Sequence, residues 1–430
     1  MAYFTAGGVR GDLSSSDLRG TLFEALDSLG PRKRVLLVPP DITRLHSRAG
    51  ELARFAWEYY GDSIRDILPA LGTHAPMSAA ELKRMFSGIP PSLFRVHDWR
   101  RDAVSLGAVP ASFVAEVTKG AVEMDWPVQL SRLIVRGGYD LILSIGQVVP
   151  HEVMGMANYS KNLLVGTGGK EAIDRSHYIG AVCGLENLMG KADNPLRSIL
   201  DRATERFLAE LPIVFIHTVV AERPDGSLAT RGLFVGDDRR AFEGAAELSA
   251  RVNVTELEEP IRKAVVYLNP EEYRSTWLGN KAIYRARMAM ADGGDLLILA
   301  PGLRRFGEDA EIDALVRKYG YRGRSATIEA VRAHEDLAGS LCAAAHLIHG
   351  SEEGRFTVTY CPGWLSEAEI ESVGFRYADP EEARRAYPPE LLKEGWNELP
   401  SGERVFFISN PALGLWVHRG MKETGRSARS

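Results

Sequence analysis

Short runs of apolar and β-branched residues recur along the chain, separated by longer stretches with helical periodicity. An apolar run of roughly four to eight residues is typical of a strand buried on both faces, as in a parallel sheet. Seven runs fit this description: Arg34–Val38, Asp140–Ile145, Pro212–Val220, Lys263–Leu268, Asp295–Ala300, Arg355–Tyr360 and Arg404–Ser409. The helical stretches include Asp17–Leu29, Asn194–Glu210, Glu271–Ala291 and Ile328–Leu347. This alternation predicts an α/β fold with mainly parallel sheets.

Two helix starts are marked by a serine with a glutamate three positions later, at Ser78 with Glu81 and at Ser366 with Glu369. In such a capping box each side chain accepts a hydrogen bond from the other residue's backbone N–H. The pattern therefore predicts that a helix begins directly after each serine.

The length of the chain predicts two domains. A chain of 430 residues is too long for one ordinary hydrophobic core. A charged patch and a proline at Glu258–Pro260 come directly before a predicted strand, and we place the boundary there. We expect one α/β domain over residues 1–260 and a second over 261–430, with a cleft between them.

Composition restricts the class of protein. The hydrophobic and charged fractions, 45% and 25%, are typical of globular proteins, and a net charge of −5 predicts no general attraction to nucleic acid or membranes. Cys183, Cys342 and Cys361 are odd in number and far apart, which argues against a disulfide framework or a thiolate metal site. The first residues lack a secretion signal, and no apolar run is long enough to cross a membrane, so we expect a cytoplasmic protein.

Polar residues follow the first predicted strand in the sequence VPPDITRLHS. Asp41, Thr43 and Arg44 come at its carboxyl end, where ligands bind in open α/β sheets. Arg44 could bind a substrate carboxylate through its planar guanidinium. A rigid turn with a solvated Arg44 and a capping Asp41 explains this stretch alone slightly better.

Two further histidines lie in predicted loops. His74, in LGTHAPMS, precedes a capped helix and is placed for proton transfer. Taken alone, a loop histidine is more often a surface or hydrogen-bonding residue. His97, in VHDW, has the same ambiguity.

The glycine-rich segment from Pro150 to Val182 contains His151, Lys161 and His177. Lys161 could bind phosphate, form a Schiff base or anchor a group covalently. The sequence GTGGKE is not a phosphate loop, because glutamate follows the lysine where that motif requires Ser or Thr. Two hydrogen-bonded histidines and a solvated lysine would explain each residue singly, but explain the three together less well.

The sequence NKAIYRARMAMADGGDLLILAPG contains Lys281 in a predicted, partly buried helix. A lysine with its aliphatic stem buried and its ammonium in water is the ordinary explanation.

These stretches together resemble the nickel-pincer-nucleotide-dependent lactate racemase family. PPDITR resembles its Asp-x-Thr-Arg element, GTHAPMS its histidine loop and PHEVMGMANYSK its His-then-Lys segment. RSHYIGAVCGLENLMGKADNPLRSIL is similar to its later histidine, and NKAIYRARMAMADGGDLLILAPG to its second-domain lysine helix. Each motif alone is weak, but all five occur in the family's order between Val38 and about Leu299.

The resemblance implies a role for each candidate residue. Lys161 would tether a pyridinium mononucleotide that binds nickel through two sulfur-containing arms, and His177 would complete nickel coordination. His74 and His151 would act as alternating acid and base. Arg44 and Lys281 would orient the substrate, and Asp41 and Thr43 would help to hold cofactor or substrate. Residues 1–260 would bind the cofactor, and residues 261–430 would close over the substrate.

The implied activity is racemisation or epimerisation of a 2-hydroxy acid. A histidine removes the hydroxyl proton while the α-hydrogen leaves as hydride to the cofactor, and a 2-oxo acid forms. Return of the hydride to the other face inverts the centre. The implied partners are a small 2-hydroxy acid and the enzymes that make the cofactor, with no nucleic acid or membrane.

The chain departs from lactate-specific members of the family at three places. It has Leu278 beside Trp277 where they carry glutamine, and His334–Ala338 lacks the tryptophan of their Asp-Gln-Trp element. Asn158–Ser160 replaces the glycines that usually precede the tether lysine. The second-domain changes favour a substrate larger than lactate.

Two alternatives remain open. A hydrolase or lyase could bind zinc through His74, His151 and His177. A non-catalytic relative could keep the fold and bind a ligand without turnover.

Overall fold

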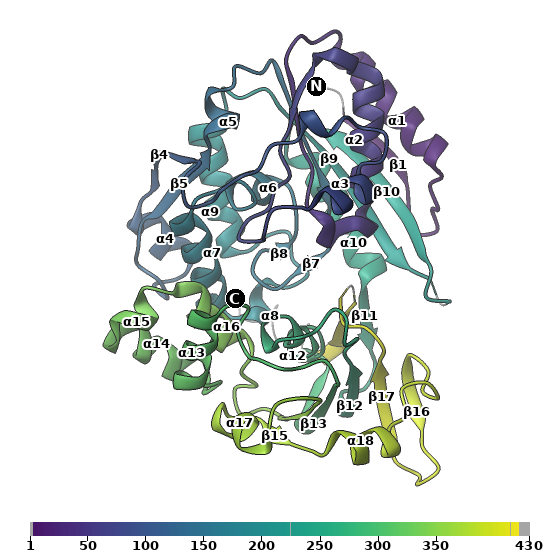
Figure 1. The fold of residues 1–430 in the computed structure, drawn as a ribbon, viewed down its shortest axis with the longest axis vertical. Helices are drawn as coiled ribbons and strands as arrows, with labels where there is room; N and C mark the ends of the chain where they lie inside the picture. The colour runs from purple at the N-terminus through teal and green to yellow at the C-terminus, as the bar shows by residue number, and fades with distance from the viewer. Residues whose placement is uncertain (1–2, 224, 413, 421–430) are drawn as a thin grey trace. The chain divides into compact units, whose positions relative to one another are not determined.

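The computed structural model describes residues 3–223, 225–412 and 414–420 and divides into two compact units (Figure 1). Unit 1 comprises Met1–Ser176 and Leu188–Asn253, and unit 2 comprises His177–Asn187 and Val254–Ser430. The main division follows Asn253, a few residues before the boundary expected at residue 260. The sequence did not indicate that His177–Asn187 groups with the second unit.

Unit 1 is built on a six-stranded sheet in the order β1-β10-β9-β6-β2-β3. The neighbouring strands β9, β6, β2 and β3 are parallel, and β10 and β1 extend the sheet antiparallel. The strand bounds are β1 (Phe4–Gly7), β2 (Val35–Val38), β3 (Ile64–Ile67), β6 (Leu141–Gln147), β9 (Ile213–Glu222) and β10 (Leu228–Gly236). Two small ribbons accompany the sheet: β4 (Ala103–Val109) with β5 (Trp126–Ser131), and β7 (Pro150–His151) with β8 (Gly155–Met156).

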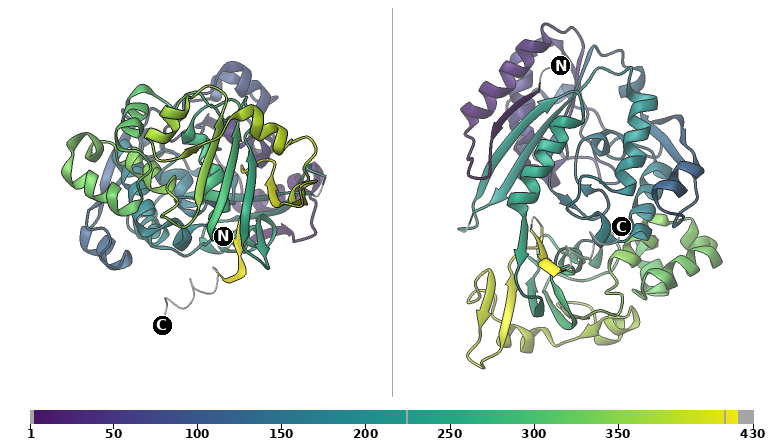
Figure 2. Two further views of the ribbon diagram at one scale, coloured as in Figure 1. Left: turned by 90° about the horizontal axis from the view of Figure 1, so that it is seen from below. Right: turned by 180° about the vertical axis from the view of Figure 1, so that it is seen from behind.

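Helices cover both faces of this sheet. On one face, α1 (Ser15–Leu29) and α2 (Ala49–Tyr60) bury their apolar sides against alternate strand residues such as Val35 and Leu37. On the other face, α10 (Arg239–Asn253) lies across β9 and β10 (Figure 2). Because both faces are covered, the central strands are apolar throughout, which explains their continuous hydrophobic runs in the sequence.

Unit 2 contains a second six-stranded sheet, in the order β15-β14-β13-β12-β17-β16. All its neighbouring strands are parallel except the edge strand β16. The bounds are β12 (Ile261–Tyr267), β13 (Met290–Ala300), β14 (Thr357–Pro362), β15 (Arg376–Tyr377), β16 (Gly395–Glu398) and β17 (Arg404–Ile408). A separate parallel pair joins β11 (Val254–Leu257) to β18 (Leu415–His418).

The remaining helices connect these strands. In unit 1 they include α3 (Ala79–Met85), α4 (Ala111–Val117), α5 (Arg132–Arg136), α6 (Ser160–Leu164) and α9 (Pro195–Ala203). Unit 2 contains α13 (Ala310–Tyr319), α17 (Glu367–Ser372), α18 (Pro380–Ala386) and all of α8 (Leu185–Leu188) except Leu188, which belongs to unit 1. The division between the units falls inside α7 (Lys170–Cys183). No helix in the described ranges is long and apolar enough to cross a membrane.

The predicted α/β fold with mainly parallel sheets is confirmed, and each of the seven predicted strands overlaps an observed one. Both predicted capping boxes are also present, with Ser78 bonded to Glu81 and Ser366 to Glu369.

Two long predicted helices were wrong. The stretch 271–291 forms two short helices, α11 (Thr276–Gly279) and α12 (Lys281–Ala286), and then enters β13. Hydrogen bonds from Tyr360 to the side chain of Asn280 and from Thr276 to Phe306 fix the break through contacts that local periodicity does not encode. The stretch 328–347 is divided among three helices: α14 (Arg324–Ala333), α15 (Glu335–Ala338) and α16 (Leu341–His349).

Candidate functional site

Three of the predicted site segments follow neighbouring parallel strands of unit 1. Asp41 follows β2, His74 follows β3 and His151 follows β6, and β2 lies between the other two strands. The chain therefore leaves β2 toward β3 in one direction along the sheet, and leaves the neighbouring β6 toward β9 in the opposite direction. Such a reversal creates a crevice at the carboxyl ends of the strands, where ligands bind in α/β proteins.

Asp41 and His74 form a close pair at this edge. Oδ2 of Asp41 lies 2.6 Å from Nδ1 of His74, while Oδ1 accepts a 2.5 Å hydrogen bond from the hydroxyl of Thr43. The Asp41 side chain is only 6% exposed, whereas that of His74 is 57% exposed. The pair thus joins a buried carboxylate to an imidazole that reaches solvent.

The pKa of the Asp41 carboxyl is lowered, although its burial alone would raise it. The hydrogen bond and charge of His74, the Thr43 hydroxyl and the charge of Arg44 outweigh that burial. Asp41 is therefore ionised at neutral pH. It also caps the short 3-10 helix Ile42–Ser47, in which Arg44 lies partly buried.

His151 lies in the β7–β8 hairpin and is held differently. Its Nδ1 accepts hydrogen bonds from the backbone N–H groups of Val153, at 3.1 Å, and Met154, at 3.4 Å. These bonds form within the turn of the hairpin, so the ring orientation is set by local backbone geometry.

Lys161 lies in the short helix α6, which is bound to the same sheet edge. The amide of Asn162 donates to the carbonyl of Val38 and to the hydroxyl of Ser144, each at 3.0 Å. Gly72, in the loop that carries His74, donates to the carbonyl of Gly166 just after this helix. Strands β2 and β6, the loop after β3 and the helix of Lys161 are therefore linked directly.

Burial, followed by the positive charge of Arg44, lowers the pKa of the Lys161 ammonium to about 8. The carboxylates of Glu152 and Asp41 act in the opposite direction and do not restore the ordinary value. A lysine with this pKa has a reactive neutral fraction at physiological pH.

The backbone before Lys161 has the conformation that glycine favours, although Asn158–Ser160 stand where the family usually has glycines. Asn158 and Tyr159 have φ angles of 67° and 59°, in the left-handed region that favours glycine. Tyr159 is stabilised there by packing against Phe215 and Phe242, with ring centroids 4.5 and 5.1 Å apart. The chain therefore keeps a glycine-like conformation with other side chains.

Arg197, in α9, braces this strained turn and was missed from the sequence. Its fully buried guanidinium donates to the carbonyl of Met156 at 2.7 Å and to the hydroxyl of Ser160 at 3.0 Å. It also lies over the ring of Phe242 at 4.6 Å. An arginine in an amphipathic helix gives no sequence signal that it is buried.

The other predicted site residues, His177 and Lys281, belong to unit 2 and are both partly buried. The segment of His177 is held within this unit by Glu186, whose carboxylate lies 2.7 Å from the guanidinium of Arg287. Burial raises the pKa of Glu186, but the charge of Arg287, together with hydrogen bonds, lowers it by more, so the net shift is downward. We call Glu186 and Arg287 the unit 2 clamp.

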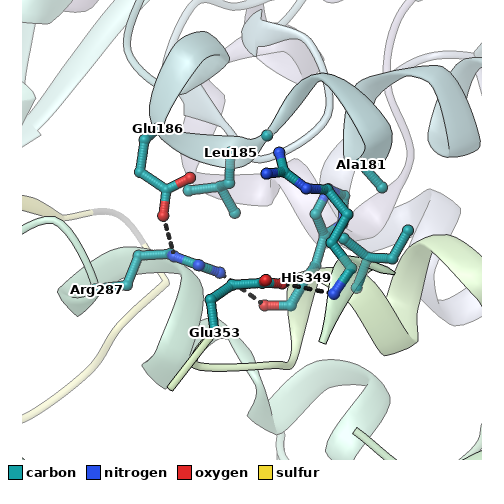
Figure 3. A pocket seen from close by; sticks show the side chains of 9 residues that line it. Ala181, Leu185, Glu186, Arg287, His349 and Glu353 are labelled. Carbon is teal, nitrogen blue, oxygen red and sulfur yellow. Dashed lines mark hydrogen bonds and ion pairs between the residues drawn. The ribbon is translucent and has the colours of Figure 1, made fainter. Parts of the chain in front are cut away.

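A cavity of about 180 Å³ lies beside the clamp (Figure 3). Arg287 also donates to the carbonyl of Ser351, at 3.1 Å, and Glu353 accepts from the backbone of Arg324, at 2.8 Å. The charged groups around this cavity are thus paired with each other or with backbone groups, which indicates a structural role.

Lys281 begins α12 beside a buried network of aromatic and polar side chains. Asn280 accepts from the hydroxyl of Tyr360, at 2.7 Å, and the ring of Trp277 packs on His346 with centroids 4.6 Å apart. Both ring nitrogens of His346 bond to tyrosine hydroxyls, those of Tyr284 and Tyr321. The helix start that carries Lys281 is therefore rigidly supported.

Other candidates have structural partners. Nε2 of His97 lies 2.9 Å from the carbonyl of Gly168, and the ring is buried. Lys170 forms an ion pair with Asp174. Among the residues that the structure describes, no three His, Cys, Asp or Glu side chains are grouped so that they could hold a metal ion.

Comparisons with known proteins agree with this architecture. Residues 23–187 match the family model of the lactate racemase N-terminal domain. A crystal structure of a protein from Thermotoga maritima matches with a TM-score of 0.80 and 26% identity, over 96% of this chain and 100% of that chain. The lactate racemase apoprotein from Thermoanaerobacterium thermosaccharolyticum has a similar fold, with a TM-score of 0.71 and 16% identity over the same shares. No curated protein matches the sequence.

Proposed function

We propose that this chain, which belongs to a lactate racemase-like family, is an isomerase that inverts the configuration of a 2-hydroxy acid through a 2-oxo acid. The observation that carries the proposal is the arrangement at one sheet edge of unit 1. There, a buried carboxylate at Asp41 orients an exposed imidazole at His74, and the low-pKa amine of Lys161 lies on a helix bonded to the same edge.

The pair of Asp41 and His74 suits removal of a hydroxyl proton. A carboxylate that accepts from Nδ1 keeps the lone pair of Nε2 available and stabilises the imidazolium that forms. A second histidine, His151, follows the adjacent strand β6 and provides the second acid–base group that inversion requires. Arg44 supplies a positive charge for the substrate carboxylate at the same edge.

The residues fit the nickel-pincer nucleotide used by the lactate racemase family. Lys161 would hold it covalently, because an amine with a pKa of about 8 can act as a nucleophile near neutral pH. His177 would provide a nickel ligand. When bound, this cofactor supplies the acceptor for the α-hydrogen as hydride, which no amino-acid side chain can supply.

The substrate is proposed to be larger than lactate. Trp277 and Leu278 precede Lys281, and both are partly exposed. An aromatic ring and an aliphatic side chain at these positions favour an apolar substituent over a small methyl group. Lys281 would orient the substrate's carboxylate or hydroxyl.

The experiment that tests the function is co-expression with the cofactor-making enzymes, followed by intact-protein mass, metal analysis and chiral chromatography on a panel of 2-hydroxy acids. We expect a covalent mass adduct, nickel and interconversion of enantiomers. Lys161→Ala should lose the adduct and Lys170→Ala, the matched control, should keep it. His177→Ala should keep the adduct and lose nickel more readily.

Other results would support different functions. Stoichiometric zinc without an adduct, together with hydrolysis or elimination, would favour the zinc enzyme. A bound adduct with no turnover of any 2-hydroxy acid in the panel would favour a non-catalytic relative. An adduct that survives Lys161→Ala but not Lys170→Ala would show that Lys170, and not Lys161, carries the tether.

A further inference from the structure

We infer that His74 and His151 rest in opposite tautomers, so that only His74 is a proton acceptor at Nε2 in the resting protein, while His151 is a proton donor there. The assignment of tautomers rests on hydrogen bonds within unit 1. Its consequence for turnover rests on the function proposed above.

The tautomer of His74 is fixed by Asp41. A carboxylate is only an acceptor when ionised, so the 2.6 Å contact between Oδ2 and Nδ1 requires a proton on Nδ1. The Thr43 hydroxyl occupies the other carboxylate oxygen as a donor and orients the group. In the neutral ring, Nε2 then carries a lone pair.

The tautomer of His151 is fixed by the opposite kind of partner. Two backbone N–H groups, from Val153 and Met154, point at its Nδ1, which must therefore accept. In the neutral ring the proton resides on Nε2. To make Nε2 an acceptor, the proton must move to Nδ1, and both backbone bonds must open.

The two histidines therefore differ in what they can do first. A hydroxyl that faces His74 can pass its proton to Nε2, which gives an imidazolium paired with Asp41. When the cofactor is bound, the α-hydrogen would leave as hydride, with the electron pair of its C–H bond, and the carbonyl that forms would accept a hydrogen bond from Nε2–H of His151. A hydroxyl that faces His151 meets an N–H donor instead of a lone pair.

Inversion consequently includes a step at the β7–β8 hairpin. His151 must gain a proton from water at Nδ1 before it can give one up at Nε2, because loss of the only ring proton would leave an imidazolate; its ring is partly exposed. The bonds from Val153 and Met154 must open for that gain. Oxidation of the enantiomer that faces His74 needs no such opening.

Histidine-selective ¹⁵N NMR tests the tautomers directly on the full chain without cofactor. At about pH 8 we expect His74 to have a protonated Nδ1 and an unprotonated Nε2, and His151 the reverse. Spectra of His74→Gln and His151→Gln assign the two signals. Asp41→Asn should shift the His74 signals and leave those of His151 unchanged, which a general structural disturbance would not do. The same tautomer at both residues would overturn the inference.

Single-turnover oxidation in the cofactor-loaded protein tests the consequence. We expect one enantiomer to be oxidised at least about tenfold faster than the other. His151→Gln, whose amide can still donate, should keep the fast phase, and His74→Gln should lose it. Equal rates for both enantiomers would overturn the unequal roles, even if NMR supports the tautomers. Failure to form any adduct would instead count against the proposed function and leave the NMR result standing.

Discussion

At Lys161, burial and reactivity are coupled in one side chain. Its ammonium is stabilised less by the fold than by water, which lowers its pKa from 10.5 to about 8. An amine at this pKa is roughly one-tenth neutral at pH 7, whereas an ordinary lysine is far less so. The fold therefore makes the amine nucleophilic at the expense of its own stability.

This coupling predicts that Lys161→Met stabilises the protein while it abolishes the tether. At pH 7 the free energy of unfolding should rise by on the order of 1–3 kcal/mol, because a partly buried ammonium with a lowered pKa is removed. Between about pH 8 and 10.5 Lys161 is protonated in the unfolded chain but mostly neutral in the folded one. The free-energy cost of Lys161 to the folded state therefore falls as the pH rises, and the stability gained by Lys161→Met should shrink. Urea unfolding at pH 7 and pH 10 measures both effects.

The matched control is Lys170→Met, at a lysine whose side chain is 51% exposed. It should change the free energy of unfolding by less than about 0.5 kcal/mol at either pH. A Lys161→Met protein that is less stable than the parent at pH 7 would contradict the prediction.

At the scale of elements, the segment His177–Asn187 depends on the unit 2 clamp. Arg287 is 3% exposed and connects the carboxylate of Glu186 to the carbonyl of Ser351. Removing one partner of a buried ion pair leaves the other without compensation, which costs several kcal/mol. The clamp therefore determines how firmly this segment is held.

We predict that Arg287→Met lowers the free energy of unfolding by roughly 2–4 kcal/mol and speeds amide exchange in residues 177–187. Hydrogen–deuterium exchange followed by mass spectrometry measures the local effect. Arg324→Met is the matched control, because this arginine is exposed and its hydrogen bond to the same segment, to the carbonyl of Val182, is long at 3.5 Å. Equal protection of residues 177–187 in the parent and Arg287→Met would show that the clamp does not hold them.

At the scale of the whole molecule, each unit contains a deeply buried histidine that the fold keeps neutral. Burial lowers the pKa of His217 in unit 1 and of His346 in unit 2 to about 3. Each unfolded histidine, with a pKa near 6.5, binds a proton that the folded one does not. Stability from these groups is therefore complete above about pH 6.5 and is lost progressively as the pH falls toward 3.

We predict that the free energy of unfolding falls between pH 7 and pH 5, with a slope that approaches about 1.4 kcal/mol per pH unit for each buried histidine. His217→Asn should lower the free energy of unfolding at pH 7. It should also reduce the slope by the share of one histidine, about 1.4 kcal/mol per pH unit at most. Chemical unfolding at four pH values measures this slope. His334→Asn, at an exposed ring, should leave it nearly unchanged. An unchanged slope in His217→Asn would contradict the assignment.

The sequence predicted much of this architecture, because buried parallel strands have long apolar runs and capping boxes are local. It also identified the residues at the sheet edge, since Asp41, His74 and His151 each follow a strand or precede a cap. The brace from Arg197 and the strained Tyr159 were not predictable, because both depend on packing between segments far apart in the chain. The break at Asn280 was missed for the same reason.

The order of strands in unit 1 has a consequence for how its chemistry could be altered. The pairing of Val35 with Leu141 and with Ile64 fixes where three loops start, whatever the length or sequence of those loops. Residues 73–76 are exposed and could therefore be exchanged for a segment from a relative with little change to the core, whereas residues 148–157 contribute buried side chains such as Val148 and Met154 to it. The sheet is a modular scaffold, and new substrates are more readily reached by grafting at this edge than by redesigning the interior.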